Sequence, residues 1–440
     1  MVLASPAGAV PPGYEPLERL VSVDGEVRRE AAREIVAGGD RSLIPGIVDA
    51  VFFVKRLERL DLYTALEGLT GEKLPRSFYD WVEWVGAHPE IKPKEGYPEW
   101  KLSLLQRIDR RFAAFLYRGA PMRVRLEEVV WGGVKVDGIP SLDDPAVLPA
   151  AEARGMRDDE AVFGVSLGGA QRAYPVRILS WHEMTNDVVG GEPIALSYCT
   201  LCGSAILYGT RTPKGSPYRF GTSGLLYRSN KLMFDRSSYT LWSNITGEPV
   251  IGRLANSSVR LPMLPVTRTT WKEWRERFPD TTVVSLEQEA GKRAGYEYLP
   301  GAADRARRDV KFPVWQKSNA LPRDEEVFAL RIGSATKAYP LAALYAEKLV
   351  QDRLGETDLL LLADPSSGAV RAYDRSGKTF AVGPTSREVK DDSGARWKVE
   401  EEGLVRVDDP TVRLPRVAGH IAFWFGWYGF YPETEIYKRR

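Results

Sequence analysis

The stretch that decides the fold is VFGVSLGGAQRAYPVRILSWHEMTNDVVGGEPIALSYCTLCGSAILY, residues 162–208, because the chain contains a second version of it. Residues 159–208 align without a gap onto residues 324–373, at a constant offset of 165. Fifteen of the 50 aligned positions are identical, and most of these are glycine, proline or apolar residues. Self-similarity at a fixed spacing indicates two copies of one supersecondary unit.

The repeated stretch has the pattern of an antiparallel α+β unit. Residues 162–175 alternate around Gly168-Gly169, which predicts a β-hairpin, and Pro175 opens a predicted helix that ends at Gly190-Gly191. The runs IALSY and AILYG predict strands on either side of the CTLCG loop. The predicted fold class is therefore α+β, with two tandem β-β-α-β-β copies, of which the second is degenerate.

Upstream of the repeat the pattern is helical. Two amphipathic stretches lie between Asp24 and Val51; Gly38-Gly39 ends the first, and Asp40 or Ser42 caps the second. Further helical patterns at LDLYTALEGLTG, SFYDWVEWVGAH and WKLSLLQRIDRRFAAFLY suggest a HEAT-like unit, which either binds a protein partner or packs against the next domain. The expected divisions are a flexible terminus (1–15), the helical unit (16–122), the first copy with the candidate site (123–320) and the second copy with an aromatic C-terminal strand (321–440).

Composition excludes several classes of protein. The 61 basic and 59 acidic residues nearly cancel, so the chain lacks the charge excess that a nucleic-acid phosphate backbone attracts. No run approaches the roughly 18 apolar residues that a membrane-spanning helix needs. The first residues, MVLASPAGAVPPGYEP, have neither the basic start nor the apolar segment of an intact secretory signal, although they suit the remnant of a trimmed one.

Only the first copy of the repeat contains the candidate metal ligands. His182 aligns with Glu347, Cys199 with Asp364 and Cys202 with Ser367, so three candidate ligands are absent from the second copy together. Two thiolates in a C-x-x-C loop and an imidazole from the preceding helix suit a mononuclear copper or zinc ion. The leading hypothesis is therefore a metal-binding protein with a redox or metal-handling role.

Other residues are candidates for this site. His420 or Met233 is a possible fourth ligand, although His420 equally suits a core histidine beside the buried aromatic run AFWFGWY. Glu183 is a candidate catalytic residue or a partner that orients His182, and His88 suits a helix C-cap. A polar segment between residues 219 and 252 offers a candidate cofactor pocket or, equally, hairpin turns and ion pairs; its candidate residues are Ser223, Arg228, Asp235, Arg236 and Trp242.

Three alternatives to the metal hypothesis remain. A dithiol redox centre has the right C-x-x-C spacing, but Ala205-Ile206-Leu207 favours a strand after the loop, where a thioredoxin-like site has a helix. A zinc deaminase fits poorly because its H-x-E pattern is absent. The third alternative is a non-catalytic, partner-binding protein in which Cys199 and Cys202 form a disulfide or hold a purely structural metal.

Several motifs together resemble one known family. WGGVKVDGIPSLDDPAV, RAYPVRILSWHEMTNDVVGG, YCTLCGSAILY, FGTSGLLYRSNKLMFDRSS and HIAFWFGWYGFYP are similar to the bacterial and archaeal family called domain of unknown function 3179, from about Leu126 to the C-terminus. The resemblance implies that His182, Glu183, Cys199 and Cys202 belong to a family pattern, but it supplies no reaction. Similar proteins often have Pro and Tyr where this chain has Thr200 and Phe234. Members often look exported, which favours an extracytoplasmic location.

Overall fold

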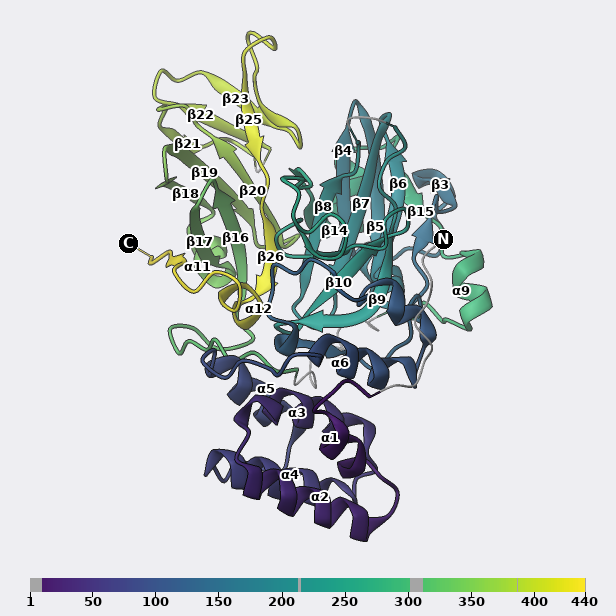
Figure 1. Cartoon of the computed structure of the whole chain (residues 1–440). Helices are drawn as coiled ribbons and strands as arrows, with labels where there is room; N and C mark the ends of the chain where they lie inside the picture. Colours follow the sequence, from purple (N-terminus) through teal and green to yellow (C-terminus); the bar gives the residue numbers. More distant parts are fainter. Residues whose placement is uncertain (1–9, 213–214, 301–311, 386, 440) are drawn as a thin grey trace.

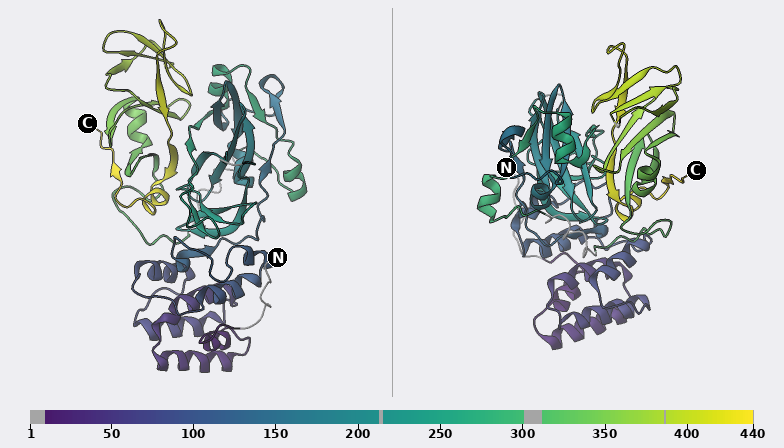
Figure 2. Two further views of the ribbon diagram at one scale, coloured as in Figure 1. Left: turned by 45° about the horizontal axis from the view of Figure 1, so that its top comes forward. Right: turned by 180° about the vertical axis from the view of Figure 1, so that it is seen from behind.

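The structure, a computed structural model, describes residues 10–212, 215–300, 312–385 and 387–439. A helical unit at the N-terminal end carries two β-rich bodies that stand side by side (Figure 1), and the same arrangement is visible from two further directions (Figure 2). The fold class is α+β, as the sequence predicts. In the part of the chain that the structure describes, no helix is long and apolar enough to cross a membrane.

The N-terminal helices begin and end near the predicted signals. Asp24 accepts a hydrogen bond from the Glu26 amide at the start of the second helix, and Gly39 ends it in the left-handed conformation. The predicted helix from Trp100 is too long, because the regular helix stops at Gln106 and a short 3₁₀ turn follows. The helices are α1 (Glu15–Leu20), α2 (Gly25–Gly38), α3 (Ile44–Phe53), α4 (Arg59–Thr70), α5 (Phe78–Ala87) and α6 (Tyr97–Gln106).

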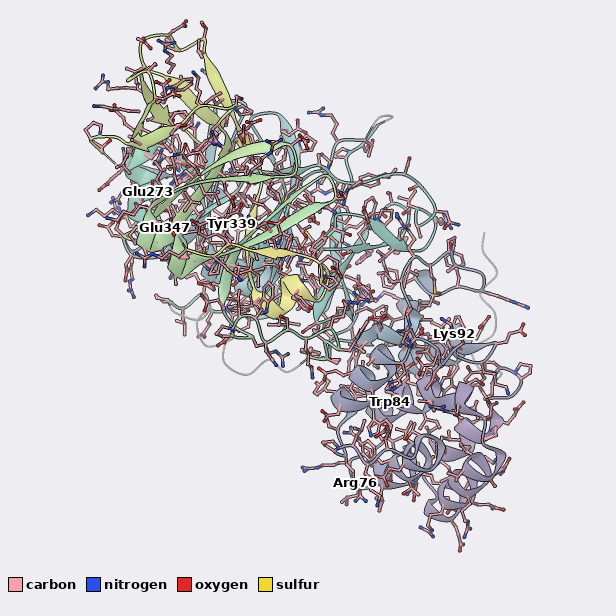
Figure 3. All side chains as sticks on the ribbon, turned by 90° about the vertical axis from the view of Figure 1, so that its left-hand side faces the viewer. Arg76, Trp84, Lys92, Glu273, Tyr339 and Glu347 are labelled. Atoms are coloured by element: carbon pink, nitrogen blue, oxygen red, sulfur yellow. The ribbon has the colours of Figure 1, made fainter. Side chains whose placement is uncertain are left out.

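The helical unit shares one hydrophobic core with the sheet above it. That sheet contains β1 (Val129–Trp131), β9 (Phe220–Tyr227), β10 (Asn230–Asp235), β11 (Leu241–Ser243) and β12 (Pro249–Ile251). Leu225, Phe234 and Ile251 of this sheet belong to the same buried cluster as Ile47 and Trp100 of the helices. The described part of the terminus expected to be flexible joins this core too, since Tyr14 is buried against Trp100. The helices therefore pack against the next domain; Figure 3 shows Trp84 among them.

The first copy contains one strand more than predicted. Its elements are β4 (Ala161–Leu167), β5 (Ala170–Pro175), α7 (Val176–His182), β6 (Met184–Val189), β7 (Glu192–Cys199) and β8 (Ser204–Gly209). The predicted helix from Pro175 to Gly190 is wrong beyond His182, because Glu183 takes a left-handed conformation (φ 57°) and ends the helix. Residues 184–189 then form β6, which turns through Gly190-Gly191, both at positive φ, into β7.

The second segment carries the same six elements, each shifted by 165 residues. They are β16 (Glu326–Ile332), β17 (Ala335–Pro340), α11 (Leu341–Glu347), β18 (Leu349–Leu354), β19 (Thr357–Asp364) and β20 (Ala369–Asp374). Lys348, opposite Glu183, also lies at positive φ (62°) and ends its helix in the same way. We call residues 161–284 the first copy and residues 326–436 the second copy.

The correspondence extends beyond the aligned sequence. In the first copy β13 (Met263–Leu264), β14 (Thr267–Thr270), α8 (Trp271–Arg277) and β15 (Thr282–Val284) follow an insertion. In the second copy β25 (Arg413–Val417), β26 (His420–Phe423), α12 (Trp424–Tyr428) and β27 (Glu435–Ile436) follow another. Thr267 pairs with Gly164, and His420 pairs with Ala329, the residue aligned with Gly164. Thr267 and His420 therefore occupy equivalent positions.

The two insertions make the copies different. In the first copy, β9 to β12 form a separate sheet that packs on β6, β7 and β8 through Met184, Ile206 and Met233. In the second copy, the inserted strands instead extend the sheet of β18, β19 and β20 to eight strands. These inserted strands are β21 (Phe380–Val382), β22 (Glu388–Asp391), β23 (Arg396–Val399) and β24 (Gly403–Arg406). Smaller elements complete the first body: β2 (Leu142–Asp143), β3 (Val147–Pro149) and α9 (Glu289–Ala294).

The copies face each other through equivalent elements. β26 of the second copy lies against β8 of the first, and β14 of the first lies against β20 of the second. Because β26 and β14 are equivalent, as are β8 and β20, the interface has approximate two-fold symmetry. One half of it lies beside the C-x-x-C loop, and the other half lies beside the loop of Asp364 and Ser367.

Candidate functional site

The C-x-x-C loop joins two central strands of the first copy. Cys199, the last residue of β7, pairs with Ser204, the first residue of β8, and Gly203 takes a left-handed conformation before β8 begins. Both cysteines are free thiols, and their exposed fractions are 1% and 0%. The β7 and β8 ladder thus holds both sulfurs on a rigid hairpin away from solvent.

A second hairpin, between β9 and β10, forms the opposite wall. Its two-residue turn consists of Arg228 and Ser229, with φ values of 48° and 61°, between the paired residues Tyr227 and Asn230. A two-residue turn with positive φ at both positions is ordinarily made by Asn and Gly, so Arg and Ser carry a conformational cost here. The Ser229 carbonyl accepts a hydrogen bond from the Cys202 thiol at 3.3 Å. The strained turn therefore contacts the sulfur site directly.

A buried lysine and glutamate stand beside Cys199. The Lys231 ammonium donates to the backbone carbonyl of Glu183 and lies 3.9 Å from its carboxylate oxygen Oε2. The Thr200 hydroxyl donates to the other carboxylate oxygen at 3.1 Å. The exposed fractions of the Lys231 and Glu183 side chains are 6% and 16%. The two charges are thus close together in a region of low polarity, with Cys199 as their neighbour.

The environments of the two thiols drive their pKa values apart. Burial and the Glu183 carboxylate raise the pKa of Cys199, but the neighbouring Cys202, the Lys231 backbone amide and the Lys231 ammonium outweigh them, so the net shift is downward. The pKa of Cys202 is raised well above its ordinary value by burial and by the neighbouring Cys199. Burial also raises the pKa of Glu183 and lowers that of Lys231. Cys199 is therefore the thiol more easily deprotonated.

Residues of the second copy also contact the loop that carries the thiols. The Phe423 amide donates to the Cys202 carbonyl at 2.8 Å, which ties the end of β26 to the loop. A Cβ atom at Gly426 of α12 would lie 2.8 Å from Cys202 Cβ, so glycine is required at this position. The sulfur site is thus assembled from both copies, although its thiols come from only one.

The structure does not bring His182 to the sulfurs. Its Nδ1 donates to the Pro140 carbonyl at 2.6 Å, and its Nε2 accepts from the Tyr298 hydroxyl at 2.5 Å. Burial lowers the pKa of this imidazole, which fits the neutral ring that these two bonds require. Its counterpart Glu347 also accepts from a tyrosine hydroxyl, that of Tyr437, at 3.0 Å. His182 therefore fills a structural role that a different residue fills in the second copy.

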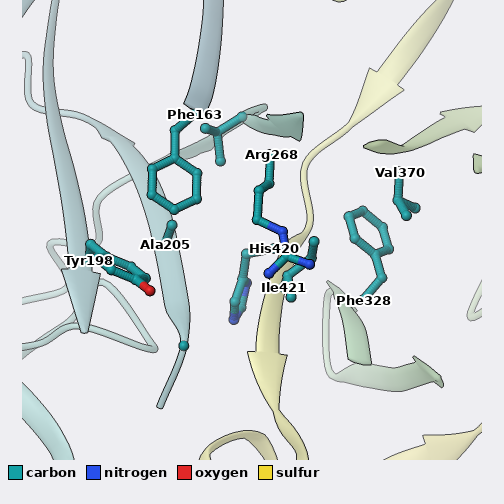
Figure 4. A pocket seen from close by; sticks show the side chains of 10 residues that line it. Phe163, Tyr198, Ala205, Arg268, Phe328, Val370, His420 and Ile421 are labelled. Carbon is teal, nitrogen blue, oxygen red and sulfur yellow. The ribbon is translucent and has the colours of Figure 1, made fainter. Parts of the chain in front are cut away.

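His420 does not join the sulfurs either. It lies on β26 with an exposed fraction of 3%, beside a cavity between the copies (Figure 4), and burial lowers its pKa to about 4. Met233 belongs to the apolar cluster between the two sheets of the first body, and His88 caps α5 while stacking on Trp84. Across the described ranges, no three His, Cys, Asp or Glu side chains are grouped as metal ligands.

The predicted pocket residues are held within hairpins. Asp235 accepts hydrogen bonds from Ser237, Ser238 and the Trp242 indole, and Asp391 accepts from Ser393 and Trp397 in the second copy in the same way. Ser223 donates to the Leu232 carbonyl, Arg236 pairs with Asp137, and Arg228 pairs with Glu128. None of the five lines the cavity between the copies, and Asp235 and Trp242 form a turn found in both copies.

Sequence reasoning missed Lys231, Ser229 and Asn230. One signal for them was present in the sequence: the short segment YRSNK lies between two strand patterns and predicts a two-residue turn without glycine. Such a turn is strained by itself, so it indicates that contacts with surrounding residues hold its conformation. The Asn230 amide donates to the Ser204 hydroxyl at 3.2 Å and accepts from the Asn244 amide at 3.0 Å, linking the turn to the thiol loop.

Comparison with known proteins places the chain in a family without assigning a reaction. No curated protein matches it, and no solved structure matches it. Residues 136–434, which include the first copy, the thiol loop and all of the second copy except its last strand, match the family described as "Protein of unknown function (DUF3179)". Since this match spans more than half of the sequence, the chain belongs to the DUF3179 family.

Proposed function

We propose that Cys199 and Cys202 form a thiol–disulfide redox pair that cycles between a dithiol and an intramolecular disulfide. The observation that carries this proposal is the placement of two free, buried thiols three residues apart on one hairpin, where Cys202 is close enough to lower the pKa of Cys199. Lys231 adds a cation beside Cys199, which stabilises a thiolate and disfavours a bound metal cation. Cys199 is the proposed nucleophile, and Cys202 is the resolving thiol.

The proposed reaction is exchange with a small disulfide, because the sulfurs are too deeply buried to reach a disulfide on a protein surface. The Cys199 thiolate attacks one sulfur of the small disulfide, forming a mixed disulfide and releasing one thiolate. Cys202 then attacks the Cys199 sulfur; the S–S bond to the small molecule breaks, and the Cys202 proton leaves on the second released thiol. Two electrons have passed from the protein dithiol to the small disulfide.

Equilibration with mixtures of reduced and oxidised dithiothreitol tests this proposal. We expect a single two-electron transition, seen by mass spectrometry after alkylation as the joint loss of two reactive thiols. Cys199→Ser and Cys202→Ser should each abolish the transition, whereas His182→Gln should leave its midpoint unchanged, because His182 bonds to Pro140 and Tyr298 and not to sulfur. Two thiols that stay reduced in the native wild type at every ratio would refute the proposal.

The second copy offers a matched control. Asp364→Cys and Ser367→Cys, made in a chain whose native cysteines are replaced by serine, move the C-x-x-C spacing onto the equivalent hairpin. In the second copy the inserted strands belong to the same sheet as that hairpin, whereas β9 and β10 form part of a separate sheet, so the surroundings of the moved pair differ. If the surroundings tune the pair, its transition should occur at a different midpoint. Equal midpoints would show that spacing alone sets the potential.

A soft metal ion remains the second candidate, favoured by two buried sulfurs with no disulfide between them. Copper(I) accepts thiolate ligands readily, whereas a zinc site needs further donors that the described residues do not group around the sulfurs. Metal analysis of wild type beside Cys199→Ser separates the candidates. Stoichiometric copper in the wild type alone would favour metal handling, and a stable disulfide in native material would favour a non-catalytic, partner-binding protein.

A further inference from the structure

The turn between β9 and β10, which faces the thiols, also joins three separate parts of the chain. The Arg228 side chain donates to Glu128 Oε2 at 2.8 Å and to Gln316 Oε1 at 2.7 Å. It donates as well to the Gly429 carbonyl at 2.8 Å. Glu128 immediately precedes β1, Gln316 lies in the linker between the two copies, and Gly429 follows α12 of the second copy. We call these four residues the Arg228 junction.

The contacts around the Arg228 junction are well shielded from solvent. The exposed fractions of the Arg228 and Glu128 side chains are 17% and 3%. The Trp315 indole donates to the same Glu128 oxygen at 2.7 Å, and the Arg228 guanidinium lies 5.4 Å from the centroid of the Trp315 ring. Arg125 pairs with Glu128 at 3.6 Å and donates to two backbone carbonyls of α5. One guanidinium therefore links the helical unit, the linker and the second copy.

Ser229, the other residue of this turn, is held in place by Cys202. Ser229 has an exposed fraction of 1% and positive φ, a conformation that is unfavourable for a residue with a side chain. Its hydroxyl has no hydrogen-bond partner among the described residues. Its carbonyl accepts from the Cys202 thiol at 3.3 Å, and within the described ranges the structure shows no other donor to that carbonyl. The thiol hydrogen of Cys202 thus fixes one side of a strained turn.

Oxidation of the thiol pair removes this hydrogen bond. When Cys202 forms a bond to the Cys199 sulfur, its proton leaves on the thiol released from the small disulfide, so Cys202 can no longer donate. The Ser229 carbonyl is then left buried without a donor, which is unfavourable. The turn relieves this cost by moving the carbonyl, and Arg228 moves with it because the two residues are adjacent in one two-residue turn.

We propose that the thiol pair is a redox switch for the Arg228 junction: the dithiol form holds the junction in place, and the disulfide form loosens it. This inference rests on the proposed function, because it needs the disulfide to form. A second tie between the copies, from the Phe423 amide to the Cys202 carbonyl, does not involve sulfur. Oxidation therefore loosens the contacts of Arg228 and leaves that backbone tie intact.

The second copy has no such connection between its loop and a neighbouring turn. Ser367, which aligns with Cys202, donates to Asp364 of its own loop at 2.9 Å. Ser367→Ala is therefore a matched control, because it removes a donor at the equivalent position of the other copy without affecting the Arg228 junction.

Hydrogen–deuterium exchange of the full chain, followed by mass spectrometry of peptic fragments, tests the switch. In oxidised dithiothreitol, the amides of residues 226–231, 312–317 and 427–431 should exchange about threefold faster than in reduced dithiothreitol, a factor within the range that one hydrogen bond supplies. The amides of α4 should be unaffected. Faster exchange throughout the chain would show a general loss of stability and would overturn the proposal.

Variants of the two cysteines separate the switch from the redox reaction. Cys202→Ala lacks the donor and should show fast exchange at the junction even under reducing conditions, whereas Cys202→Ser keeps a hydroxyl donor and should resemble the reduced wild type. Cys199→Ala keeps the Cys202 thiol but cannot form the disulfide, so its junction should not respond to oxidised dithiothreitol.

Two results overturn the switch in distinguishable ways. Equal exchange in Cys202→Ala and Cys202→Ser, with a disulfide present in the oxidised wild type, would overturn the switch and leave the proposed function standing. A wild type in which mass spectrometry never detects the disulfide would overturn both.

Discussion

The two copies share a framework and differ in what their equivalent loops contain. In the first copy the loop between β7 and β8 holds two buried thiols that face the β9–β10 turn. In the second copy Asp364 accepts hydrogen bonds from Ser366 and Ser367 and closes the loop by itself. One hairpin geometry is thus compatible with either set of residues. The cysteines are not needed to make the turn, so their presence in one copy needs a chemical explanation.

The interface between the copies also has equivalent positions that carry different residues. One half is filled by a buried network of Arg371, Glu401, Glu273 and Thr267, and the other half contains the cavity beside His420. Equivalent backbone positions therefore carry ion pairs on one side and an unpaired imidazole on the other. Charged side chains are concentrated in the network, and an imidazole without a partner among the described residues lies at the equivalent place opposite. Substitutions at equivalent residues of the two copies therefore measure how differently the two copies depend on them.

The largest difference is expected at the turn between β6 and β7. A Cβ atom at Gly190 would collide with the Leu167 carbonyl, whereas one at the equivalent Gly355 would meet only Ala335 Cβ at 3.6 Å. Both glycines have φ of 57°. Gly355→Ala should therefore cost only the left-handed strain, about 1–2 kcal/mol, and Gly190→Ala should cost more than about 4 kcal/mol, the range of severe backbone effects. Urea denaturation measures both free energies of unfolding.

Equal losses for the two glycine variants would show that the close approach of the two hairpin turns in the first copy relaxes at little cost. Gly191→Ala provides the control, because Gly191 shares the positive φ and a Cβ there meets no atom within 4 Å. Its loss should match that of Gly355→Ala.

The next effect is expected at the buried network. Arg371 corresponds to Ile206, and Arg371→Ile installs the apolar residue of the first copy while leaving the buried Glu401 without its nearest cation. Breaking a buried ion pair from one side typically costs about 3–5 kcal/mol. Chemical denaturation at pH 7 should show a loss of that size. The double variant Arg371→Ile with Glu401→Gln should recover part of it, and no recovery would mean that packing rather than charge causes the loss.

The same network sets an acid limit on stability. Burial raises the pKa of Glu401, but the arginines Arg371, Arg416 and Arg277 outweigh it and lower the pKa to about 2. Because the folded pKa lies below the unfolded value, this contribution is present above about pH 4.3 and is lost as pH falls toward 2. In Glu401→Gln that loss should be absent. An unchanged slope between pH 4 and 2 would assign the acid sensitivity to other carboxylates.

His420 should make its own half of the interface sensitive to mild acid. Its pKa of about 4 lies below the ordinary value of 6.5, so below pH 6.5 the unfolded chain binds a proton that the folded chain does not. Stability should therefore fall by about 3 kcal/mol as pH drops from about 6.5 to 4. His420→Gln should remove that part of the decline. Thermal denaturation from pH 7 to 4 measures the difference, and parallel curves for the two proteins would contradict the buried, neutral imidazole.

Local patterns predicted much of this fold because they depend on neighbouring residues. The Gly168-Gly169 hairpin and the strands around the thiol loop lie at the residues where the sequence pattern predicts them. The helix after Pro175 was predicted too long because its end depends on Glu183, a residue with no intrinsic preference for the left-handed conformation. Its carbonyl accepts from the Tyr198 amide and from Lys231, contacts that no local pattern contains.

The candidate site was predicted only in part for the same reason. Cys199 and Cys202 were identified by spacing, whereas Lys231 and Ser229 come from a hairpin in the insertion and reach the sulfurs through tertiary packing. The joint absence of His182 and the cysteines from the second copy suggested one shared site. The structure separates them, because Glu347 replaces His182 as the acceptor for a tyrosine. Residues that change together between copies therefore need not act together.

The smallest difference is expected where the copies agree most closely. Tyr174 donates to Asp187 at 2.7 Å, and the equivalent Tyr339 donates to Asp352 at 3.0 Å. Each aspartate also pairs with a cation of its own copy, Arg172 or Lys337. Tyr→Phe at either position removes one buried hydrogen bond to a charged group and should cost about 1.5–3 kcal/mol. The two losses, measured by urea denaturation, should be of similar size, because each variant removes the same kind of hydrogen bond at equivalent positions. A clearly larger loss at Tyr174 would mean that the first copy relies on this framework more than its twin does, which would follow if holding two thiols in place demands a stiffer sheet.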